Sequence, residues 1–255
     1  MIIGGGCYGC YHARQLLRGA VKGALEFQEL VIVDRDPACA ARKEFAGQAG
    51  VRFVTADWVD FVDDYLDRAL TGTADVMVPT PIGPHLMYEW LRRRVERRSV
   101  LHAAAFERLP ATPYAERSPT GTGYLSFATW TCPVTCVEPA ICPVTRGPKE
   151  WEMDEAVFAF ARDEAGEGRP FDEVTVFRCR PLAFGIAAWP TAHALRVRDR
   201  FDRLLAMWAP EGLADGVVPR ACRILVATTS SCHGVADLLE LHPRHTGPAG
   251  ERNPA

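Results

Sequence analysis

The first hundred residues alternate between short apolar runs and longer segments whose apolar residues recur at helical spacing. The apolar runs predict buried strands, and the amphipathic segments predict helices. The expected strands are residues 1–3, 29–34, 51–57, 74–80 and 99–105, and the expected helices are residues 7–20, 37–50, 58–70 and 84–98. Strands separated by helices of this length pair in parallel through right-handed crossovers. The pattern therefore predicts an α/β fold built on a doubly wound parallel sheet.

The pattern changes after residue 105. Residues 107–123 are rich in Pro, Gly, Ser and Thr, which is typical of a linker or a long loop. Farther along we expect strands, a cysteine-rich loop and helices, with a strand, a polar turn and a final helix over residues 222–241. We therefore expect three parts: a dinucleotide-binding domain at 1–105, a smaller α/β or α+β part at 106–241, and a disordered tail at 242–255.

A glycine-rich segment follows the first expected strand. In "GGGCYGCYHA", Gly4, Gly6 and Gly9 have the G-x-G-x-x-G spacing, between an expected strand and an expected helix. This arrangement permits a tight turn, a close approach of backbone to a pyrophosphate, and close packing of helix on strand. Asp34 ends the second expected strand, where a carboxylate accepts hydrogen bonds from the ribose hydroxyls. The pattern predicts an NAD(H) site, although Arg35 softens the preference against NADP(H).

Two alternatives to a dinucleotide remain open. A doubly wound fold can carry a glycine turn without binding any nucleotide. The fold that binds S-adenosylmethionine also uses a glycine loop with an acid after the second strand and often one after the third, where Asp57 lies.

On these motifs the first 105 residues resemble the Rossmann-fold NAD(P)-binding superfamily. The segment "LVIVDRDPACA" is similar to the TrkA-N (RCK) domains of potassium uptake systems, and "ADVMVPTPIGPH" is similar to the fourth-strand segment of glucose-fructose oxidoreductase-like enzymes. The resemblance implies that the adenosine diphosphate of the cofactor is bound by Gly4, Gly6, Gly9 and Asp34, and that its nicotinamide side is lined by Thr80 and Pro81. The Lys-Pro that those enzymes carry after strand five is replaced by "HAAAFERLP", so their catalytic lysine cannot be transferred.

Nine cysteines occur in a chain with no segment typical of an export signal, a context that disfavours disulfides and favours metal binding or thiol chemistry. Three of them, Cys132, Cys136 and Cys142, lie in "TWTCPVTCVEPAICP" at a C-x3-C-x5-C spacing that fits neither zinc ribbons nor ferredoxins. A compact loop stiffened by proline favours a [4Fe-4S] cluster, with zinc or no metal as alternatives. We expect the fourth ligand to be Cys179, Cys232 or the substrate.

Candidate catalytic residues lie outside the cysteine loop. Cys232, in "SSCHG", precedes an expected helix, where its pKa would be lowered; the neighbouring serines could instead cap that helix. His85 follows the Thr-Pro turn and His102 ends the fifth expected strand, so each is a candidate acid or base or a surface histidine. Glu138, inside the cysteine loop, is a candidate ligand or proton donor, or a solvated acid.

Composition narrows the class of function. Hydrophobic residues make up 48% of the chain, charged residues 24%, and the net charge is −3, so nothing favours nucleic acid or a membrane surface. We expect a cytoplasmic oxidoreductase that passes electrons between NAD(H) and a small-molecule substrate, and we leave room for an electron-transfer partner and a homodimer. The alternatives are a non-enzymatic nucleotide or redox sensor of the TrkA-N type, and an S-adenosylmethionine-dependent transferase.

Overall fold

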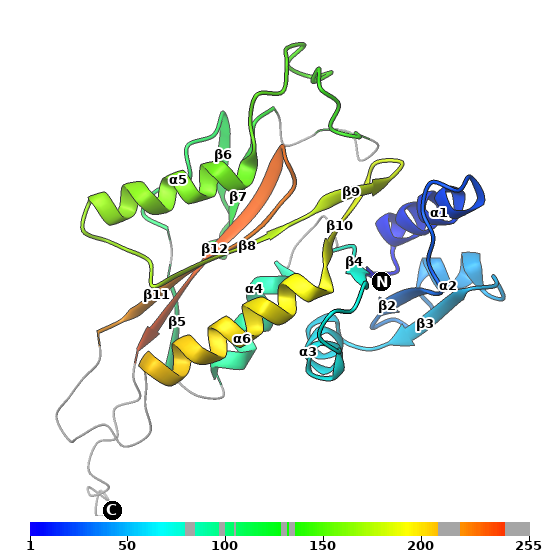
Figure 1. The fold of residues 1–255 in the computed structure, drawn as a ribbon, viewed down its shortest axis with the longest axis horizontal. Helices are drawn as coiled ribbons and strands as arrows, with labels where there is room; N and C mark the ends of the chain where they lie inside the picture. Colours follow the sequence, from blue (N-terminus) through cyan, green and yellow to red (C-terminus); the bar gives the residue numbers. More distant parts are fainter. Residues whose placement is uncertain are drawn as a thin grey trace, which may run out of the picture.

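The computed structural model of this chain is a mixed α/β structure in which helices pack on more than one sheet (Figure 1). It describes residues 1–79, 85–96, 100–104, 106–128, 132, 136–208 and 220–242, with the backbone alone for residues 100–103. The helices are α1 (Cys7–Val21), α2 (Ala40–Phe45), α3 (Trp58–Arg68), α4 (Leu86–Glu96), α5 (Met153–Gly166) and α6 (Thr191–Trp208). The strands are β1 (Ile2–Ile3), β2 (Leu30–Asp34), β3 (Val51–Thr55), β4 (Val76–Met77), β5 (Val100–Ala104), β6 (Tyr114–Arg117), β7 (Gly123–Ser126), β8 (Glu173–Arg178), β9 (Arg180–Ala183), β10 (Ile186–Pro190), β11 (Cys222–Thr229) and β12 (His233–His242).

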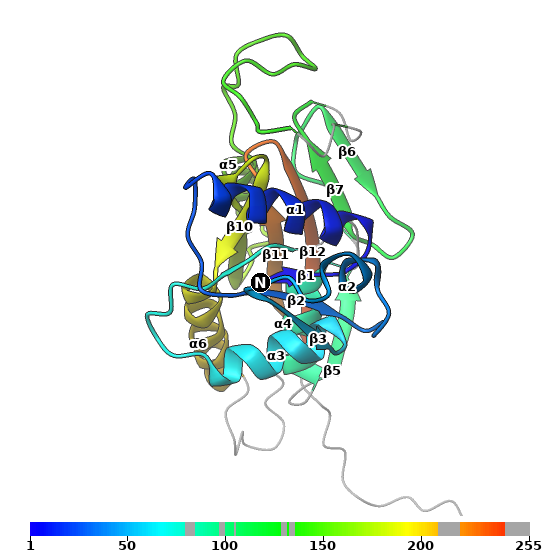
Figure 2. The same cartoon turned by 90° about the vertical axis from the view of Figure 1, so that its right-hand side faces the viewer.

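The N-terminal part contains a parallel sheet in the order β1-β2-β3. Ile2 and Ile32 pack on the face that is covered by α1 and α2, whereas Ile3 and Val33 pack on the face that is covered by α3. Figure 2 shows α1 and α3 on opposite sides of these strands. The apolar residues of β2 therefore need not alternate with polar ones, because both faces of the sheet are buried.

The strand β4 continues this sheet through a single parallel bridge. Val78, just after β4, donates its N–H to the carbonyl of Met1 at 2.9 Å and accepts the N–H of Ile3 at 3.1 Å. On its other side β4 pairs antiparallel with β10, which pairs with β9. The parallel β1-β2-β3 sheet thus leads, across β4, to antiparallel strands from the second half of the chain.

The C-terminal part is built on a larger sheet in the order β6-β7-β12-β11-β8, with β5 also paired to β12. Helix α5 covers one face of this sheet, and α4 and α6 cover the other (Figure 1). The core under α4 and α6 also includes Ile3 and Val33 of the N-terminal sheet, so one apolar core joins the two parts of the chain.

Two expectations about this region are wrong. The segment 99–105 was expected to be a fifth parallel strand, but β5 pairs antiparallel with β12. Residues 233–241 were expected to be helical, but they form β12, which pairs antiparallel with β11. The apolar residues of β12 have helix-like spacing because both faces of this strand are covered, which removes the alternation by which a strand is recognised.

Other expectations hold in part. The segment expected to be a loop, residues 107–123, contains β6 (Tyr114–Arg117). The mixed α/β class is confirmed, whereas a doubly wound sheet and the domain boundary at 105/106 stay predictions. The expected tail, apart from His242, lies outside the described residues. None of the helices in the described ranges is both long and apolar enough to cross a membrane.

Candidate functional site

The glycine loop, residues 4–9, connects β1 to α1. Gly4 has φ +97°, a conformation that favours glycine, and its N–H is bonded to the carbonyl of Val33 at 2.8 Å. A Cβ on Gly9 would lie 2.1 Å from the carbonyl oxygen of Gly4, so this position admits no side chain. A Cβ on Gly6 would meet nothing within 4 Å, which leaves open space at the start of α1.

The start of α1 has the features of an anion site. Gly6 is the N-cap, it offers no side chain to the first helical N–H groups, and the first turn holds no acidic residue. Those N–H groups have no partner inside the helix, and the helix dipole places partial positive charge there. A phosphate could accept hydrogen bonds from this turn.

Asp34 lies beside the glycine loop. Its Oδ2 accepts the N–H of Gly5 at 2.6 Å, and its Oδ1 accepts the N–H of Asp36 at 2.9 Å. The carboxylate is therefore fixed at the end of β2, against Gly5 of the glycine loop. Asp57, in contrast, caps α3 by accepting the N–H groups of Val59 and Asp60. Thr80 and Pro81 lie outside the described residues.

A second site, which we name the cysteine pocket, gathers four thiols. The pocket is lined by Cys132, Cys136, Cys142 and Cys232, with Glu138, Lys149 and His233 also in its wall. Its volume is about 10 Å³, which is room for about one water molecule. Across the described residues, no three His, Cys, Asp or Glu side chains are already arranged as a metal site, so the thiols share a pocket without forming a finished ligand set.

Of the two cysteines expected to complete the set, only Cys232 lines the pocket. Cys179 packs instead against the core beneath α4 and α6, and its N–H is bonded to the carbonyl of Thr229 at 2.7 Å. Burial raises the pKa of the Cys179 thiol to about 12. Cys179 is therefore placed as a packed core thiol.

Glu138 connects the cysteine loop to the turn between β11 and β12. Its carboxylate accepts the N–H of Ser231 at 3.1 Å, the N–H of Cys232 at 3.2 Å and the hydroxyl of Ser230. Glu138 has φ +51°, a strained backbone conformation for a residue with a side chain. It is thus a structural link between two segments more than ninety residues apart, a role that its sequence context does not reveal.

Hydrogen-bond donors surround the thiols of the pocket. The N–H of Thr145 lies 3.5 Å from Sγ of Cys142 and lowers the pKa of that thiol, and the N–H of Glu138 lies 3.4 Å from Sγ of Cys136. The indole N–H of Trp151 lies 3.3 Å from Sγ of Cys232. Such N–H groups stabilise a thiolate, which is the form that binds metal.

The expectation of a lowered pKa at Cys232 is wrong. No helix follows this residue, because the segment turns directly into β12. Burial instead raises the pKa of its thiol to about 11. Cys232 is 6% exposed, whereas reactive cysteines are typically accessible, and its catalytic role stays a prediction.

His85 lies in a buried chain of polar side chains. Its Nδ1 is 2.7 Å from Oδ2 of Asp237, and its Nε2 is 2.9 Å from Oγ1 of Thr228. Each ring nitrogen of His85 therefore has one polar partner, a carboxylate oxygen at Nδ1 and a hydroxyl at Nε2. The other oxygen of Asp237 accepts the hydroxyl of Thr122 at 2.8 Å. This acid–imidazole–hydroxyl order can hold and move a proton, and it also fastens the start of α4 to the hairpin of β11 and β12.

The sequence singled out His85 but not its partners. Asp237 and Thr228 lie 152 and 143 residues away, and no local pattern marks them. His102 lies in β5 opposite Glu240, and its side chain is outside the described atoms.

Comparisons with known proteins give one result. No curated protein and no solved structure matches the chain. A family model described as "Uncharacterized protein, C-terminal domain" matches residues 87–242, which is more than half of the sequence. The match begins in α4 and runs to the end of β12, so it includes the cysteine pocket. The chain therefore belongs to this family, AF_1314_C.

Proposed function

We propose that this protein is an NAD(H)-binding redox protein whose cysteine pocket holds a metal centre, a [4Fe-4S] cluster in preference to zinc. The observation that carries the proposal is that Cys132, Cys136, Cys142 and Cys232 line one pocket, although the last is ninety residues away from the third. Four thiols are the ligand number that both iron–sulfur clusters and structural zinc use. When bound, a cluster would supply one-electron transfer, so each two-electron oxidation of NADH would require two successive transfers through it.

The geometry of the first eighty residues supports the nucleotide part of the proposal. The strands of the parallel sheet lie in the order β3-β2-β1, and a bridge from β1 to Val78, just after β4, continues that order. This is the strand order of one half of a dinucleotide-binding fold. In that fold the pyrophosphate lies at the glycine loop and a carboxylate after the second strand binds ribose. Gly6 leaves space at the start of α1, and Asp34 stands beside it.

The surroundings of the thiols support the metal part. The N–H groups of Thr145 and Glu138 and the indole of Trp151 would compensate the negative charge of thiolates in a closed site. Stacking on Phe127, with ring centroids 5.5 Å apart, holds the indole of Trp151 in place. The cysteines would lose their protons on binding metal, so affinity would rise with pH.

Individual residues of the chain would then have distinct roles. Glu138 would hold Cys232 against the cysteine loop, and His85 would hold a proton between Asp237 and Thr228 for a small-molecule substrate. Cys232 would be a ligand in place of the catalytic role that its sequence context suggests. With four protein ligands, the centre would relay electrons, and a separate electron-transfer partner fits this role. The cytoplasmic location expected from the sequence belongs to this proposal.

A non-enzymatic sensor is the second candidate. The observation that favours it is the small volume of the cysteine pocket, which holds about one water molecule and would have to open to admit a [4Fe-4S] cluster or a substrate, so that binding would itself change the structure. In this candidate the nucleotide site reports the NAD(H) state, and the cysteine pocket reports metal or redox state. An S-adenosylmethionine-dependent transferase receives less support, because Asp57 is engaged as a helix cap.

The test is metal and sulfide analysis after anaerobic purification, together with an absorption spectrum. We expect iron and acid-labile sulfide in the wild type, a large loss of both in Cys232→Ser, and retention in the matched control Cys179→Ser. Zinc without sulfide would favour the alternative metal. A colourless protein without iron, sulfide or zinc, or equal losses in the two variants, would contradict the proposed centre.

Nucleotide binding separates the remaining candidates. Calorimetry with NADH, ATP and S-adenosylmethionine ranks the ligands of the glycine loop, and NADH is expected to bind most tightly. Turnover of NADH with an artificial electron acceptor would favour an enzyme over a sensor. Binding without turnover would favour the sensor.

A further inference from the structure

A cavity of about 350 Å³ lies at the end of the large sheet away from the cysteine pocket. It opens where α5 ends, β11 begins and β12 ends, whereas the cysteine pocket lies at the turn between β11 and β12. Six residues separate Arg223, in the cavity wall, from the end of β11 at Thr229, a distance of roughly 20 Å along a strand. The volume lies at the lower end of the range of pockets that hold small molecules. We name it the arginine cavity.

Aromatic rings form the apolar wall of the arginine cavity. Phe106, Phe160 and Phe171 all line it, and the ring centroids of the first and third each lie 6.1 Å from that of Phe160. These rings come from three separate segments of the chain, and their mutual packing fixes the shape of the wall. Such a wall suits a flat apolar group.

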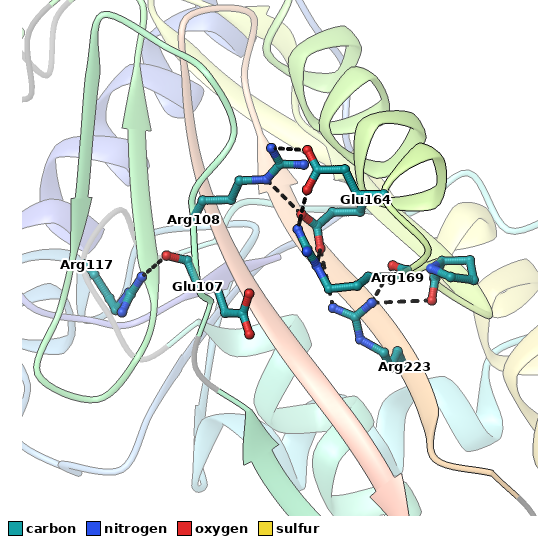
Figure 3. A network of polar contacts seen from close by, with 8 residues as sticks. Glu107, Arg108, Arg117, Glu164, Arg169 and Arg223 are labelled. Carbon is teal, nitrogen blue, oxygen red and sulfur yellow. Dashed lines mark hydrogen bonds and ion pairs between the residues drawn. The ribbon is translucent and has the colours of Figure 1, made fainter.

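Guanidinium groups form the polar wall. The carboxylate of Glu164, 5% exposed, accepts Nε of Arg108 at 2.8 Å and both Nε and Nη2 of Arg169 at 3.0 and 2.8 Å. Arg223 adds a third guanidinium, with Nη2 3.6 Å from Glu164. Figure 3 shows these three arginines converging on Glu164 from different segments of the chain.

The charges of this network do not cancel. Glu167 is the second carboxylate in contact with Arg108 and Arg169, so three guanidiniums face two carboxylates, and one positive charge remains. The hydrogen bonds from Arg169 and Arg108 lower the pKa of Glu164 to about 2, so this count holds across the physiological pH range. Arg220, which also lines the cavity, is neutralised by Asp172.

Two further acids line the cavity, and one of them, Glu240, lies directly opposite Arg223 in the pairing of β11 with β12. Glu240 pairs with His242 at 3.0 Å. Figure 3 draws no contact between the carboxylate of Glu107 and the three arginines. The one positive charge that remains belongs to the contact network of Arg108, Arg169 and Arg223, and Glu107 and Glu240 oppose it from the rest of the cavity wall.

The arginines of this wall are also held in place. The guanidinium of Arg223 lies over the ring of Phe171, 4.7 Å from its centroid, and that of Arg108 lies 5.8 Å from the centroid of Phe160. Groups that are already ordered lose little freedom when a ligand arrives. Planar guanidiniums also match the geometry of carboxylate and phosphate oxygens.

From these features we infer that the arginine cavity binds a small organic anion, in which a carboxylate or phosphate group is attached to a flat apolar body. The anionic group contacts the guanidiniums, and the apolar body packs on the phenylalanine wall. This site is independent of the nucleotide and metal proposed above, since it shares no residue with either.

The experiment uses the full chain and three probes of similar size: benzoate, phenyl phosphate and benzylamine. Calorimetry and thermal unfolding are expected to detect binding of one or both anions and no binding of the cation. Equal or tighter binding of benzylamine would mean that Glu107 and Glu240 dominate the field. That result, or an absence of binding by both anions at millimolar concentration, overturns the inference. The ratio of phenyl phosphate to benzoate affinity distinguishes a phosphate site from a carboxylate site.

Variants locate the binding. Arg223→Gln is expected to weaken binding of the anion by about tenfold or more, the loss that accompanies removal of a charged hydrogen-bond donor. The matched control is Arg117→Gln, since Arg117 lies on β6 and donates to the carbonyl of Glu107 without lining the cavity. If Arg223→Gln unfolds, the more exposed Arg108→Gln replaces it. Equal losses in the control and in the cavity variants would place the anion elsewhere.

Discussion

The glycine loop and the cysteine pocket are both formed by turns next to strands, but different contacts hold them together. The glycine loop is held by backbone: Gly4 is bonded to Val33, Gly5 is bonded to Asp34, and Gly9 packs against Gly4. All of these residues lie within the first thirty-four. The cysteine pocket joins the loop that contains Cys142 to the turn that contains Cys232, through the side chain of Glu138.

This difference determines how each region responds to substitution. Backbone atoms pack closely around Gly9 but not around Gly6. The glycine loop should therefore be destabilised by a methyl group at Gly9 and should tolerate one at Gly6. A side-chain link is weaker, so its loss should open the cysteine pocket while the rest of the fold persists.

The largest effect is expected at Gly9. In Gly9→Ala the new Cβ would lie 2.1 Å from the Gly4 oxygen, and relieving this overlap requires α1 to move away from β1. We expect a loss of at least about 3 kcal/mol in the free energy of unfolding, measured by urea denaturation. The matched variant Gly6→Ala has open space and φ −75°, so it should keep its stability while it loses NADH binding, because the methyl group occupies the phosphate position.

The variants Gly9→Ala and Gly6→Ala test backbone packing and phosphate binding separately. If Gly9→Ala is as stable as the wild type, backbone packing does not hold the glycine loop, and the contrast with the cysteine pocket disappears. If Gly6→Ala binds NADH normally, the phosphate does not lie over the start of α1.

An intermediate effect is expected at Glu138. Glu138→Ala removes the acceptor of the Ser231 N–H and leaves the N–H of Cys232 with only the hydroxyl of Ser230, a loss of about 1–3 kcal/mol for partly buried groups. Because the same change frees Cys232 from the cysteine loop, iron or zinc content should fall together with stability. Metal analysis and thermal unfolding measure the two quantities on one sample.

The control for Glu138 is Glu150→Ala, which removes an exposed acid from the same segment. We expect it to leave both metal content and unfolding temperature unchanged. A fall in metal content that is equal in the two variants would show that charge alone, and not the link to the turn, supports the cysteine pocket.

The same contrast explains how far the sequence could predict the structure. The strands and helices of residues 1–79 and the tight turn at Gly4 follow from local periodicity and glycine spacing, and the structure contains them. The β12 strand was mistaken for a helix, since α5 covers one face of its sheet and α4 and α6 cover the other, and no local signal reports this. The choice between Cys179 and Cys232 was equally out of reach, because only the fold brings the turn that contains Cys232 against the cysteine loop.

Partners of known residues were also hidden from the sequence. Glu138, Asp237 and Thr228 each act across ninety residues or more, and each would pass locally for an ordinary loop or strand residue. The sequence could therefore predict a site that is built from consecutive turns, whereas a site that is built from side chains of distant strands required the fold.

The smallest effect is expected at Asp34, where recognition depends on one charge and not on packing. Asp34→Asn keeps one carbonyl oxygen for the N–H of Gly5 but turns its NH2 group toward the N–H of Asp36, which is exposed to solvent, so stability should fall by only about 1 kcal/mol. The ribose diol loses a charged acceptor, so NADH affinity should fall by about tenfold, whereas NADPH should be weakened less because the repulsion of its 2′-phosphate is removed. Calorimetry with both nucleotides measures this, with the exposed Asp36→Asn as control. An unchanged ratio of NADH to NADPH affinity would show that Asp34 does not contact the ribose. Its carboxylate would then serve only to hold the glycine loop.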